Sequence, residues 1–466
     1  MPTSFTGLND PTPYSGQFNG NTRAAFAAML KIWYAKRWDD HVHEATYIMQ
    51  KLAKRGDRMG GLKVQTAVVT EFPQSGGVTS RENRGIATPR GGSYINPEII
   101  ARDFYLRLAW SGQVQRAAAA GDRAAFAKPR MLDIQNARKQ ADINMCRKLY
   151  LGYADILGGV VSYNDGTDTA TLYSRNARTS AGEAYWYAGR FYCRRQQSVG
   201  WAATPLGAPD WDIEGGATGV VDEAYISAVG GTTAAPTITL AGTDAGSVTD
   251  PAAEDVIVPF HNRAVSGYSA ATTDITFFSG FNGIGNICTD DSIYSALYGL
   301  DKTASGNESL KGVYSANGGT TRTYREREFS LLVDRIRDEG IGEEIDTAIM
   351  HASTRREVVA EHDGDRRYAP VQSESGFAQL ITFVGDKGIP LTSDWMCQPA
   401  MVVALNTGKW SWLEQSPMGP LGVERWVAGF DQEEMIWHKS GNIECQDPFN
   451  QGIHDDVDID VYAINS

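Results

Sequence analysis

The sequence predicts an α+β protein, in which a long helix is followed by many short strands and then by an alternation of helices and strands. The helix is expected over residues 126–157, because Pro129 stands where a first turn tolerates it and no glycine or proline follows until Gly152. Short apolar runs between Gly, Asp, Asn and Thr turns predict strands over residues 160–281. Helical and strand-like patterns alternate from Tyr324 onward, which indicates an α/β layer.

The predicted long helix carries one apolar stripe. Positions three and four residues apart lie on the same side of a helix, and the apolar ones here are Ile134, Ala137, Ala141, Met145 and Leu149. We expect this stripe to pack on a sheet, mainly through Ile134, Ala141, Met145 and Leu149. At about 1.5 Å per residue the helix would be roughly 40 Å long, which exceeds most helices of globular domains.

The composition indicates a folded protein without a membrane segment. Of the 466 residues, 42% are hydrophobic and 21% are charged, and the length suffices for two or three core-forming units. No apolar run approaches the roughly 20 residues of a membrane-spanning helix, and the N-terminus lacks the features of a secretory signal. The five scattered cysteines favour a reducing compartment over a disulfide framework.

Charge is distributed in blocks along the chain, although the net charge is −13. Residues 21–60 hold eight basic against four acidic side chains, and residues 81–150 hold thirteen against six. Residues 200–290 hold eleven acidic side chains against one arginine, and residues 440–466 hold six with no base. A solvated surface explains any single block, but the alternation suggests that basic extended segments pair with acidic β segments of neighbouring subunits.

The N-terminal region is expected to be an arm. Residues 1–20 are polar and rich in Pro and Gly, and a helix is expected to begin at residue 21 or 22. This helix would carry Trp33, Tyr34 and Trp38. Such large apolar side chains so near a terminus should be buried, and we expect a neighbouring subunit to cover them.

Two strand patterns around a turn-rich tip predict a long β hairpin. Residues 63–72 and 94–110 alternate between apolar and polar positions, and residues 73–92 between them contain Arg81, Arg84 and Arg90. An isolated two-stranded hairpin is marginal in water. We therefore expect the partner of this hairpin to lie elsewhere.

The C-terminal half reads as a helix, a buried strand and a second helix. Residues 324–339 have one apolar side, and residues 346–351, with the apolar run Ala348–Met350 at their centre, are expected to form a buried strand. Ser353 is expected to cap the second helix. Further strands are expected at residues 380–384, 401–405, 423–430 and 433–438, with a last edge strand in the acidic tail.

No catalytic, cofactor-binding or metal-binding motif stands out in the sequence. It contains no glycine-rich phosphate loop followed by Lys and Ser or Thr, no zinc-type cysteine spacing and no HExxH. His41 and His43 would diverge on a helix, which disfavours a metal site. A nucleophilic triad of His351, Cys397 and His438 has no support in their spacing. We therefore assign no catalytic residue, no cofactor and no metal.

Three other groups have both a functional and a structural interpretation. The aromatic cluster at residues 185–201 could be a sugar or base platform, but the core of a β domain is favoured. The acidic residues around Trp211, at 210–214, could act as the paired carboxylates of a glycosidase, but neighbours in a loop rarely keep that separation. The acidic residues at 455–460 could bind calcium loosely, but a solvated edge is favoured.

The order of several sequence stretches along the chain is informative. The early helix contains LKIWYAKRWDD, a strand pattern follows at residues 60–70, and the arginine-bearing loop and RLAWSGQVQRAAAA precede the long helix. Later come EFSLLVDRIRDEG, EIDTAIMHASTRREV and GFAQLITFVGDKGIPLTSDWMCQPAMVVALNTGKW. In this order, over nearly the whole chain after residue 20, the features resemble those of major capsid proteins of tailed bacteriophages with the Hong Kong 97-type fold.

The resemblance implies six regions. These are an N-terminal arm at 1–60, an extended E-loop at 61–107, a peripheral domain with the spine helix at 108–159, an inserted β-rich domain at 160–285, an axial domain at 286–410, and return strands of the peripheral domain with a C-terminal tail at 411–466. The tryptophans and tyrosine at 33–38 would make contacts of the arm. The arginines at 81, 84 and 90 would lie in the E-loop and meet acidic groups of a neighbouring subunit.

The resemblance implies a structural protein and no enzyme. Such subunits assemble as hexamers and pentamers into an icosahedral shell around phage DNA, so the expected location is the virion capsid, assembled in the cytoplasm of the host bacterium. The expected partners are other copies of the chain, portal and scaffolding proteins, a decoration protein, and packaged double-stranded DNA in non-specific contact. No membrane partner is expected.

Three alternatives stay open at this point. One is an encapsulin-like nanocompartment shell protein with the same fold, although the length and the acidic insertion weigh against it. Another is a carbohydrate-binding or carbohydrate-active β protein, which the tryptophans and carboxylates motivate. The third is an enzyme with a site that the sequence does not reveal.

Overall fold

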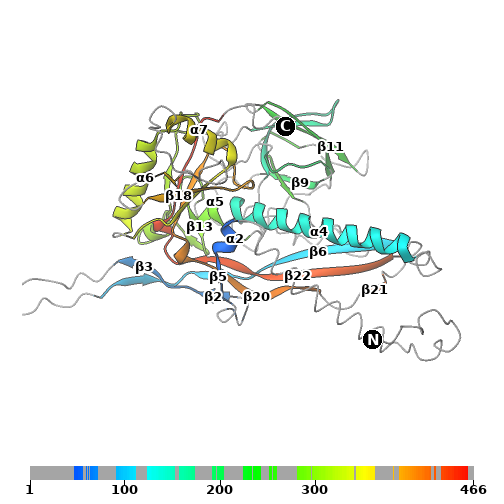
Figure 1. Cartoon of the computed structure of the whole chain (residues 1–466), viewed down its shortest axis with the longest axis horizontal. Helices are drawn as coiled ribbons and strands as arrows, with labels where there is room; N and C mark the ends of the chain where they lie inside the picture. The colour runs from blue at the N-terminus through cyan, green and yellow to red at the C-terminus, as the bar shows by residue number, and fades with distance from the viewer. Residues whose placement is uncertain are drawn as a thin grey trace, which may run out of the picture. The chain divides into compact units, whose positions relative to one another are not determined.

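The computed structural model shows a mixed α and β protein in which strands predominate (Figure 1). It describes residues 47–55, 59, 61, 63–71, 91–111, 123–152, 157–173, 191–195, 197–203, 224–232, 235–242, 251–253, 255–259, 281–294, 296–340, 343–362, 381–382, 388–420, 425–426 and 432–459. The chain divides into two compact units. In its described part the smaller unit comprises Asp103–Asp142 and Glu414–Gly441, and the larger unit comprises Thr46–Arg102, Ile143–Leu413 and Asn442–Ser466.

One sheet contains the longest strands of the described chain. Its strands are β1 (Ala53–Arg55), β6 (Arg102–Ser111), β20 (Trp410–Pro420), β21 (Arg425–Trp426) and β22 (Gln432–Cys445). Their order is β1-β20-β22-β21, and β6 also pairs with β22. Strand β1 runs parallel to β20, with Lys54 opposite Trp412, whereas β21 is antiparallel to β22.

Strand β22 is longer than the sequence pattern predicted. It has 14 residues, whereas the sequence predicted a strand only over 433–438. The C-terminal part of the strand buries polar side chains, among them Lys439, Asn442 and Glu444. Buried polar residues erase the alternation by which a strand is recognised, so the prediction stopped too early.

Helix α4 (Arg123–Leu151) has 29 residues and corresponds to the predicted long helix. It ends at Leu151 and not at residue 157, because Gly152 adopts a φ of 77°. The Gly152 N–H donates to the carbonyl oxygen of Lys148 at 2.9 Å. A Cβ at position 152 would lie 2.7 Å from Oδ1 of Asn286, so the backbone angle and the packing both require glycine.

Six strands of the larger unit form a closed antiparallel barrel. They are β7 (Gly158–Asn164), β8 (Thr169–Leu172), β9 (Ser198–Ala203), β10 (Ala224–Gly231), β11 (Pro236–Gly242) and β12 (Asp255–Pro259). Their order is β10-β11-β8-β7-β12-β9, and β10 closes onto β9. Small and branched side chains such as Leu172, Ile226, Ile238 and Ile257 fill the barrel. Short strands were expected here, but their closure into a barrel was not.

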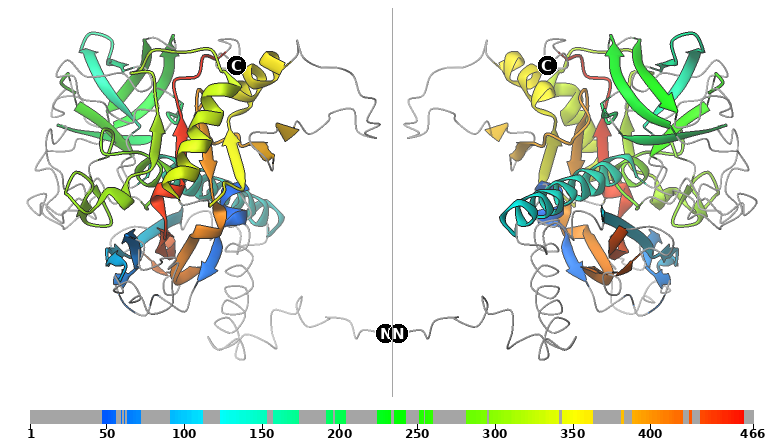
Figure 2. Two further views of the ribbon diagram at one scale, coloured as in Figure 1. Left: turned by 90° about the vertical axis from the view of Figure 1, so that its left-hand side faces the viewer. Right: turned by 90° about the vertical axis from the view of Figure 1, so that its right-hand side faces the viewer.

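A second, six-stranded sheet forms the α/β part of the larger unit. Its strands, in spatial order, are β15 (Val313–Ser315), β23 (Gly452–His454), β19 (Val402–Leu405), β16 (Thr347–Met350), β18 (Ile389–Ser393) and β17 (Ile381–Thr382). The pairs β15–β23 and β16–β18 are parallel, and the other pairs are antiparallel. Helices α6 (Glu326–Glu339) and α7 (Ala352–His362) lie beside this sheet (Figures 1 and 2).

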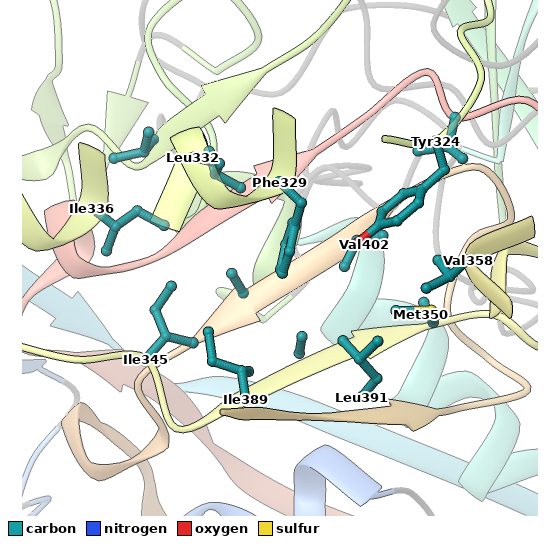
Figure 3. Close-up of a cluster of buried hydrophobic side chains, with 14 residues drawn as sticks. Tyr324, Phe329, Leu332, Ile336, Ile345, Met350, Val358, Ile389, Leu391 and Val402 are labelled. Carbon is teal, nitrogen blue, oxygen red and sulfur yellow. The ribbon is translucent and has the colours of Figure 1, made fainter. Parts of the chain in front are cut away.

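The core of this α/β part lies between α6 and the sheet (Figure 3). Phe329, Leu332 and Ile336 point from α6 toward the strands, and all three are buried. Their spacing of three and four residues is the apolar side that the sequence predicted for this helix. Val402 of β19 and Leu391 of β18 meet them from the sheet.

The start of α7 differs from the prediction. His351, and not Ser353, caps the helix, because Nδ1 of His351 accepts from the Ser353 N–H at 3.1 Å. The Ser353 hydroxyl lies 2.7 Å from the same nitrogen. Ser353 itself is buried within the first turn. An imidazole is an uncommon cap, and this explains why the sequence pattern favoured the serine.

The remaining described elements are short. They are α2 (Tyr47–Lys51), β2 (Lys63–Gln65), β3 (Val68–Glu71), β4 (Ser93–Ile95), β5 (Glu98–Ile100), α5 (Ile284–Ile287), β13 (Ala296–Leu297), β14 (Leu300–Asp301), and the single 3₁₀ turns η2 (Glu308–Leu310), η3 (Thr407–Lys409) and η4 (Pro448–Asn450). Strands β2 and β5 form one antiparallel pair, and β3 and β4 form another.

Candidate assembly elements

The two short antiparallel pairs follow one another and form a two-stranded ribbon (Figure 1). In the first pair, Val64 lies opposite Ile99, and in the second, Val69 lies opposite Tyr94. A register shift between Val69 and Glu71 marks an irregularity in the second pair. The ribbon corresponds to the predicted hairpin only up to Ile100. Residues 102–110, which the prediction also placed in the hairpin, belong to β6 and pair with β22 in the sheet of the longest strands.

A buried carboxylate links the base of the ribbon to strands β20 and β22 within the larger unit. Oε1 of Glu444 accepts from the Thr66 hydroxyl at 2.5 Å, and Oε2 accepts from the Ser411 hydroxyl at 2.8 Å. Nδ2 of Asn442 donates to the carbonyl oxygen of Ile100 at 2.8 Å. The Glu444 side chain is fully buried, so the loss of these donors would leave a carboxylate without compensation.

The other side of the ribbon faces solvent. Tyr94 is 59% exposed, and Lys63 pairs with Glu98 at 3.1 Å across the ribbon. The Lys63 ammonium lowers the pKa of Glu98 by hydrogen bonding, and Gln65 adds to this effect. An exposed ion pair of this kind contributes little to stability. The ribbon is thus fixed at its base and exposes polar and aromatic groups along its length.

The site residues predicted from sequence are only partly within the described chain. Trp33, Tyr34 and Trp38, and likewise Arg81, Arg84 and Arg90, lie outside the described residues, so their roles stay predictions. Ile134 lies in α4, but its side chain is not among those described. Ala141, Met145 and Leu149 are buried.

Close backbone packing surrounds the end of α4. A Cβ on Gly283 would lie 2.1 Å from the carbonyl oxygen of Leu149, and one on Gly285 would lie 2.7 Å from that of Leu151. Gly283 directly precedes α5, and its N–H donates to Oδ1 of Asn286 within α5 at 2.7 Å. Because these two glycines have no side chain, the backbone at residues 283–285 packs directly against the last turn of α4. The sequence offered a signal for this contact in the spacing of two glycines at FNGIGN.

A buried lysine lies behind this junction. Nζ of Lys302 donates to the carbonyl oxygens of Asn286 and Thr289, each at 2.7 Å. The side chain is fully buried, and burial lowers its pKa to about 7. The nearby carboxylate of Asp290 opposes this shift. Lysines are rarely fully buried, and no sequence pattern marked this one.

The acidic residues near the C-terminus are not a solvated edge, which corrects the prediction for 455 and 456. Asp455 and Asp456 are both buried. Oδ2 of Asp456 accepts from the N–H groups of Asn317 and Gly319, at 2.7 and 3.0 Å. Oδ2 of Asp455 accepts from the Tyr314 hydroxyl at 2.9 Å. These carboxylates thus satisfy donors of β15 and of the turn after it.

Arg322 packs beside these carboxylates. Its Nη2 donates to the carbonyl oxygen of Ser315 at 2.8 Å and to Nδ1 of His454 at 3.1 Å. Burial, and then the charge of Arg322, lower the pKa of His454 to about 3. The imidazole is therefore neutral and accepts the hydrogen bond through Nδ1. The arginine, the histidine and the turn form one fixed polar cluster.

The residues considered as a nucleophilic triad each have a local role. His351 caps α7, and His438 pairs with Asp103 at 2.9 Å, next to the Tyr105 ring. Cys397 is buried. Burial also raises the pKa of Cys193 to about 12, so its thiol stays protonated. None of these described groups is an activated nucleophile.

Other candidate sites are also absent from the described part of the chain. No group of three or more His, Cys, Asp or Glu there could hold a metal ion. No helix among the described residues is long and apolar enough to cross a membrane. Of the aromatic cluster, Tyr192 is buried and donates to the carbonyl oxygen of Met396 at 2.8 Å. Residues 210–214 lie outside the described chain.

No protein-family profile and no curated protein sequence matches the chain. Solved structures resemble it over most of its length. The cyanophage A-1(L) capsid asymmetric unit has 9% identity and a TM-score of 0.48, and the match covers 88% of this chain and 92% of that chain. A Mycobacterium phage Ogopogo structure has 10% identity and a TM-score of 0.36 over 88% and 91% of the two chains.

The capsid of Myoviridae phage XM1 is a further similar structure, with 7% identity and a TM-score of 0.37 over 88% of this chain and 90% of that chain. All three TM-scores lie below 0.5. The functional proposal therefore rests on the residues of this chain.

Proposed function

We propose that the chain is the major capsid subunit of a tailed bacteriophage, with a Hong Kong 97-type fold, and that it is a structural protein of the virion. Copies assemble as hexamers and pentamers into an icosahedral shell around double-stranded DNA. The observation that carries this proposal is the ribbon of β2–β5 and β3–β4, which is rooted by the buried Glu444 and exposes Tyr94. The order of sequence features supports the same conclusion.

The ribbon supports an assembly role for a physical reason. A two-stranded ribbon is marginal in water on its own, because it has too little apolar surface to bury. Here the base of the ribbon is fixed by a fully buried carboxylate, whose burial is offset by hydrogen bonds from the Thr66 and Ser411 hydroxyls. Extended elements that find partners on other chains are a recurrent way to join subunits, and symmetry multiplies each such contact.

The proposal keeps the six regions expected from the sequence. Residues 1–60 act as the arm, 61–107 as the E-loop, 108–159 as the peripheral domain with its spine helix, 160–285 as the inserted β-rich domain, 286–410 as the axial domain, and 411–466 as return strands and tail. Helix α4 and the long strands suit the peripheral domain, and the closed barrel suits the insertion. Portal and scaffolding proteins, a decoration protein and DNA are the proposed partners.

Electron microscopy of the purified chain, with light scattering for mass, tests the proposal. Closed shells, or rings of five and six subunits, are expected, with or without a co-expressed scaffolding protein. A 50.8 kDa monomer that stays monomeric even with scaffold would overturn it. Shells that enclose a co-purifying cargo protein and no DNA would instead favour an encapsulin-like compartment. Turnover of a polysaccharide by the monomer would favour the carbohydrate alternative.

A further inference from the structure

Aromatic and cationic side chains gather at one place on the larger unit. We name this the strand-end patch, and it consists of Phe191, Arg194, His351, Arg356 and Trp395. Trp395 is 56% exposed, which is unusual for so large an apolar side chain. Both arginines are exposed, and the phenylalanine and histidine are half-buried. None of these residues has a part in the assembly elements described above.

The position of the patch follows from the sheet. Strands β16 and β18 run parallel, with Met350 opposite Ser393, so their carboxyl ends lie at the same edge. His351 follows the first strand directly, and Asp394 and Trp395 follow the second. In open parallel sheets, the region beyond the carboxyl ends of the strands is where ligands bind, and the β16–β18 pair reproduces that arrangement locally.

Three members of the patch, Phe191, Arg194 and His351, are linked by direct contacts. The rings of Phe191 and His351 meet edge to face, with centroids 5.5 Å apart. The guanidinium of Arg194 lies 6.0 Å from the Phe191 ring, and its Nη1 donates to the Phe191 carbonyl oxygen. Burial, and then the charge of Arg356, lower the pKa of His351, so this arginine is near the imidazole. The patch is therefore cationic through its arginines only.

The backbone that carries Trp395 is held firmly. The buried carboxylate of Asp394 accepts from the Tyr150 hydroxyl at 2.8 Å and from the Met396 N–H at 2.9 Å. The Asp394 N–H donates to the Met350 carbonyl oxygen at 2.9 Å. Tyr192 secures the other side through its bond to the Met396 carbonyl oxygen at 2.8 Å. An exposed tryptophan on a fixed turn is pre-organised for binding, because little entropy is lost when it is covered.

The chemistry of the patch favours an acidic partner that carries an aromatic group. Single-stranded nucleic acid also stacks on aromatic rings, but it requires a basic groove along the backbone, and this chain has a net charge of −13. The sequence itself contains a complementary segment. Residues 204–223 hold five acidic side chains and no base, and Trp211 stands between Asp210 and Asp212.

We propose that the strand-end patch binds the acidic segment 204–223 of a second copy of the chain. The carboxylates at 210 and 212 neutralise Arg194 and Arg356, and Trp211 covers Trp395. The inference rests on the proposed shell function, in which each subunit contacts several copies, and it adds one defined contact to that function.

Charge reversal tests this contact in the full chain. Arg194→Glu places a glutamate opposite the aspartates of the segment. The double variant Asp210→Lys/Asp212→Lys places lysines opposite the arginines of the patch. Each variant alone is expected to lower the yield of closed shells by about tenfold or more, because charges of like sign meet at a partly desolvated contact. An equal mixture of the two variants is expected to restore part of the yield, because wherever the two variants are neighbours each patch meets a segment of opposite charge.

Trp395→Ala provides a second test, and Tyr225→Ala is its matched control because Tyr225 is also an exposed aromatic residue. The first is expected to weaken assembly by about tenfold, and the second to leave it unchanged. Thermal unfolding of the free subunit should be the same for both, because neither side chain is buried.

Each contrary outcome has a distinct meaning. If wild-type subunits form no shells under any condition, the proposed function itself fails. If wild-type shells form and Arg194→Glu and Trp395→Ala assemble at the wild-type yield, only this inference fails. Rescue that occurs when all three charge reversals share one chain, but not in the mixture, would show an intramolecular contact and overturn the role of the second copy. Binding of a dT20 oligonucleotide that Arg194→Glu abolishes would assign the patch to nucleic acid.

Discussion

The hydroxyl of Tyr150 donates a 2.8 Å hydrogen bond to Oδ2 of Asp394 and thereby ties the last turn of α4 to the turn that follows β18. The two residues are 244 positions apart in the chain, and both are buried. Burial raises the pKa of Asp394, and the donors from Tyr150 and Met396 oppose that rise. A single bond thus joins the long helix to the sheet edge at which the strand-end patch lies.

Tyr150→Phe is expected to lower the free energy of unfolding by about 1–3 kcal/mol, because a buried carboxyl oxygen loses its donor while the ring still fills its space. Chemical denaturation of the unassembled subunit measures this change. Tyr94→Phe is the control, because the Tyr94 side chain is exposed. Equal unfolding free energies for the two variants would contradict a stabilising role for the bond.

Glu444→Leu is expected to loosen the base of the ribbon. The hydroxyls of Thr66 and Ser411 would lose their acceptor, at a cost of about 1–3 kcal/mol for each group left buried and unpaired. Faster hydrogen exchange at the Thr66 amide, which donates to the Pro97 carbonyl oxygen at 3.1 Å, would report the loosening. Glu98→Gln, on the exposed side, should leave this exchange unchanged. If Glu444→Leu also leaves it unchanged, the anchor has no such role.

Gly283→Ala is expected to destabilise the larger unit by about 3 kcal/mol or to prevent folding. The added Cβ would lie 2.1 Å from the Leu149 carbonyl oxygen, and this backbone atom belongs to α4 and cannot move aside easily. Gly61→Ala is the control, because a Cβ there meets nothing within 4 Å. Circular dichroism during thermal unfolding distinguishes the two. A wild-type midpoint for Gly283→Ala would refute the close packing of this junction.

Lys302 predicts a dependence of stability on pH. Its pKa in the folded chain is about 7, against 10.5 ordinarily, so between about pH 7 and pH 10.5 the unfolded chain binds a proton that the folded chain does not. The contribution of Lys302 to stability therefore decreases as pH falls from about 10 to 7 and is constant below that range. The decrease is on the order of a few kcal/mol. Lys302→Met should remove this part of the slope.

Unfolding free energies at pH 9.5 and pH 7 for wild type and Lys302→Met measure the effect. Lys311→Met is the matched control, because the Lys311 ammonium pairs with Asp291 at 2.9 Å at the half-exposed surface. The Lys302 interpretation fails if both variants keep the same slope between the two pH values.

Deletion of residues 73–92 is expected to give a soluble, folded subunit that forms no closed shells. The deleted tip lies beyond the described base of the ribbon, so the bonds of Glu444 would be retained. Arg84→Glu is expected to weaken assembly less severely, and more strongly at low salt, where charge repulsion is less screened. Particle yield by sedimentation measures both. Normal shells from the deletion variant would exclude a role of this segment in joining subunits.

Elements with a strong period could be predicted from the sequence. The apolar spacing of Phe329, Leu332 and Ile336 predicted α6 and the side that it buries. The proline-free and glycine-free run before Gly152 predicted α4, and the alternation over residues 63–72 and 94–100 predicted the ribbon. The same alternation at 102–110 belongs to β6, which pairs with β22 and not with the ribbon. These signals are local, because one turn or one strand contains all the information that is needed.

Features that depend on distant partners could not be predicted. Glu444 and Asp456 resemble ordinary surface acids until hydroxyl and backbone donors from other parts of the chain surround them. Lys302 is buried only because two carbonyl oxygens happen to converge on its ammonium. In the strand-end patch, the pairing of β16 with β18 brings His351 and Trp395 to one sheet edge, and the contact of Phe191 with His351 adds a segment from much earlier in the chain.

The closed barrel begins and ends with neighbouring strands. Gly158 of β7 lies opposite Ile257 of β12, and the Leu157 N–H donates to the Ile257 carbonyl oxygen at 2.8 Å. Adjacent strands lie about 4.8 Å apart, so the chain enters and leaves this module almost at one point. A short linker could therefore replace the barrel. Another compact domain whose termini are close together could also be inserted in its place, so this position suits the display of foreign proteins.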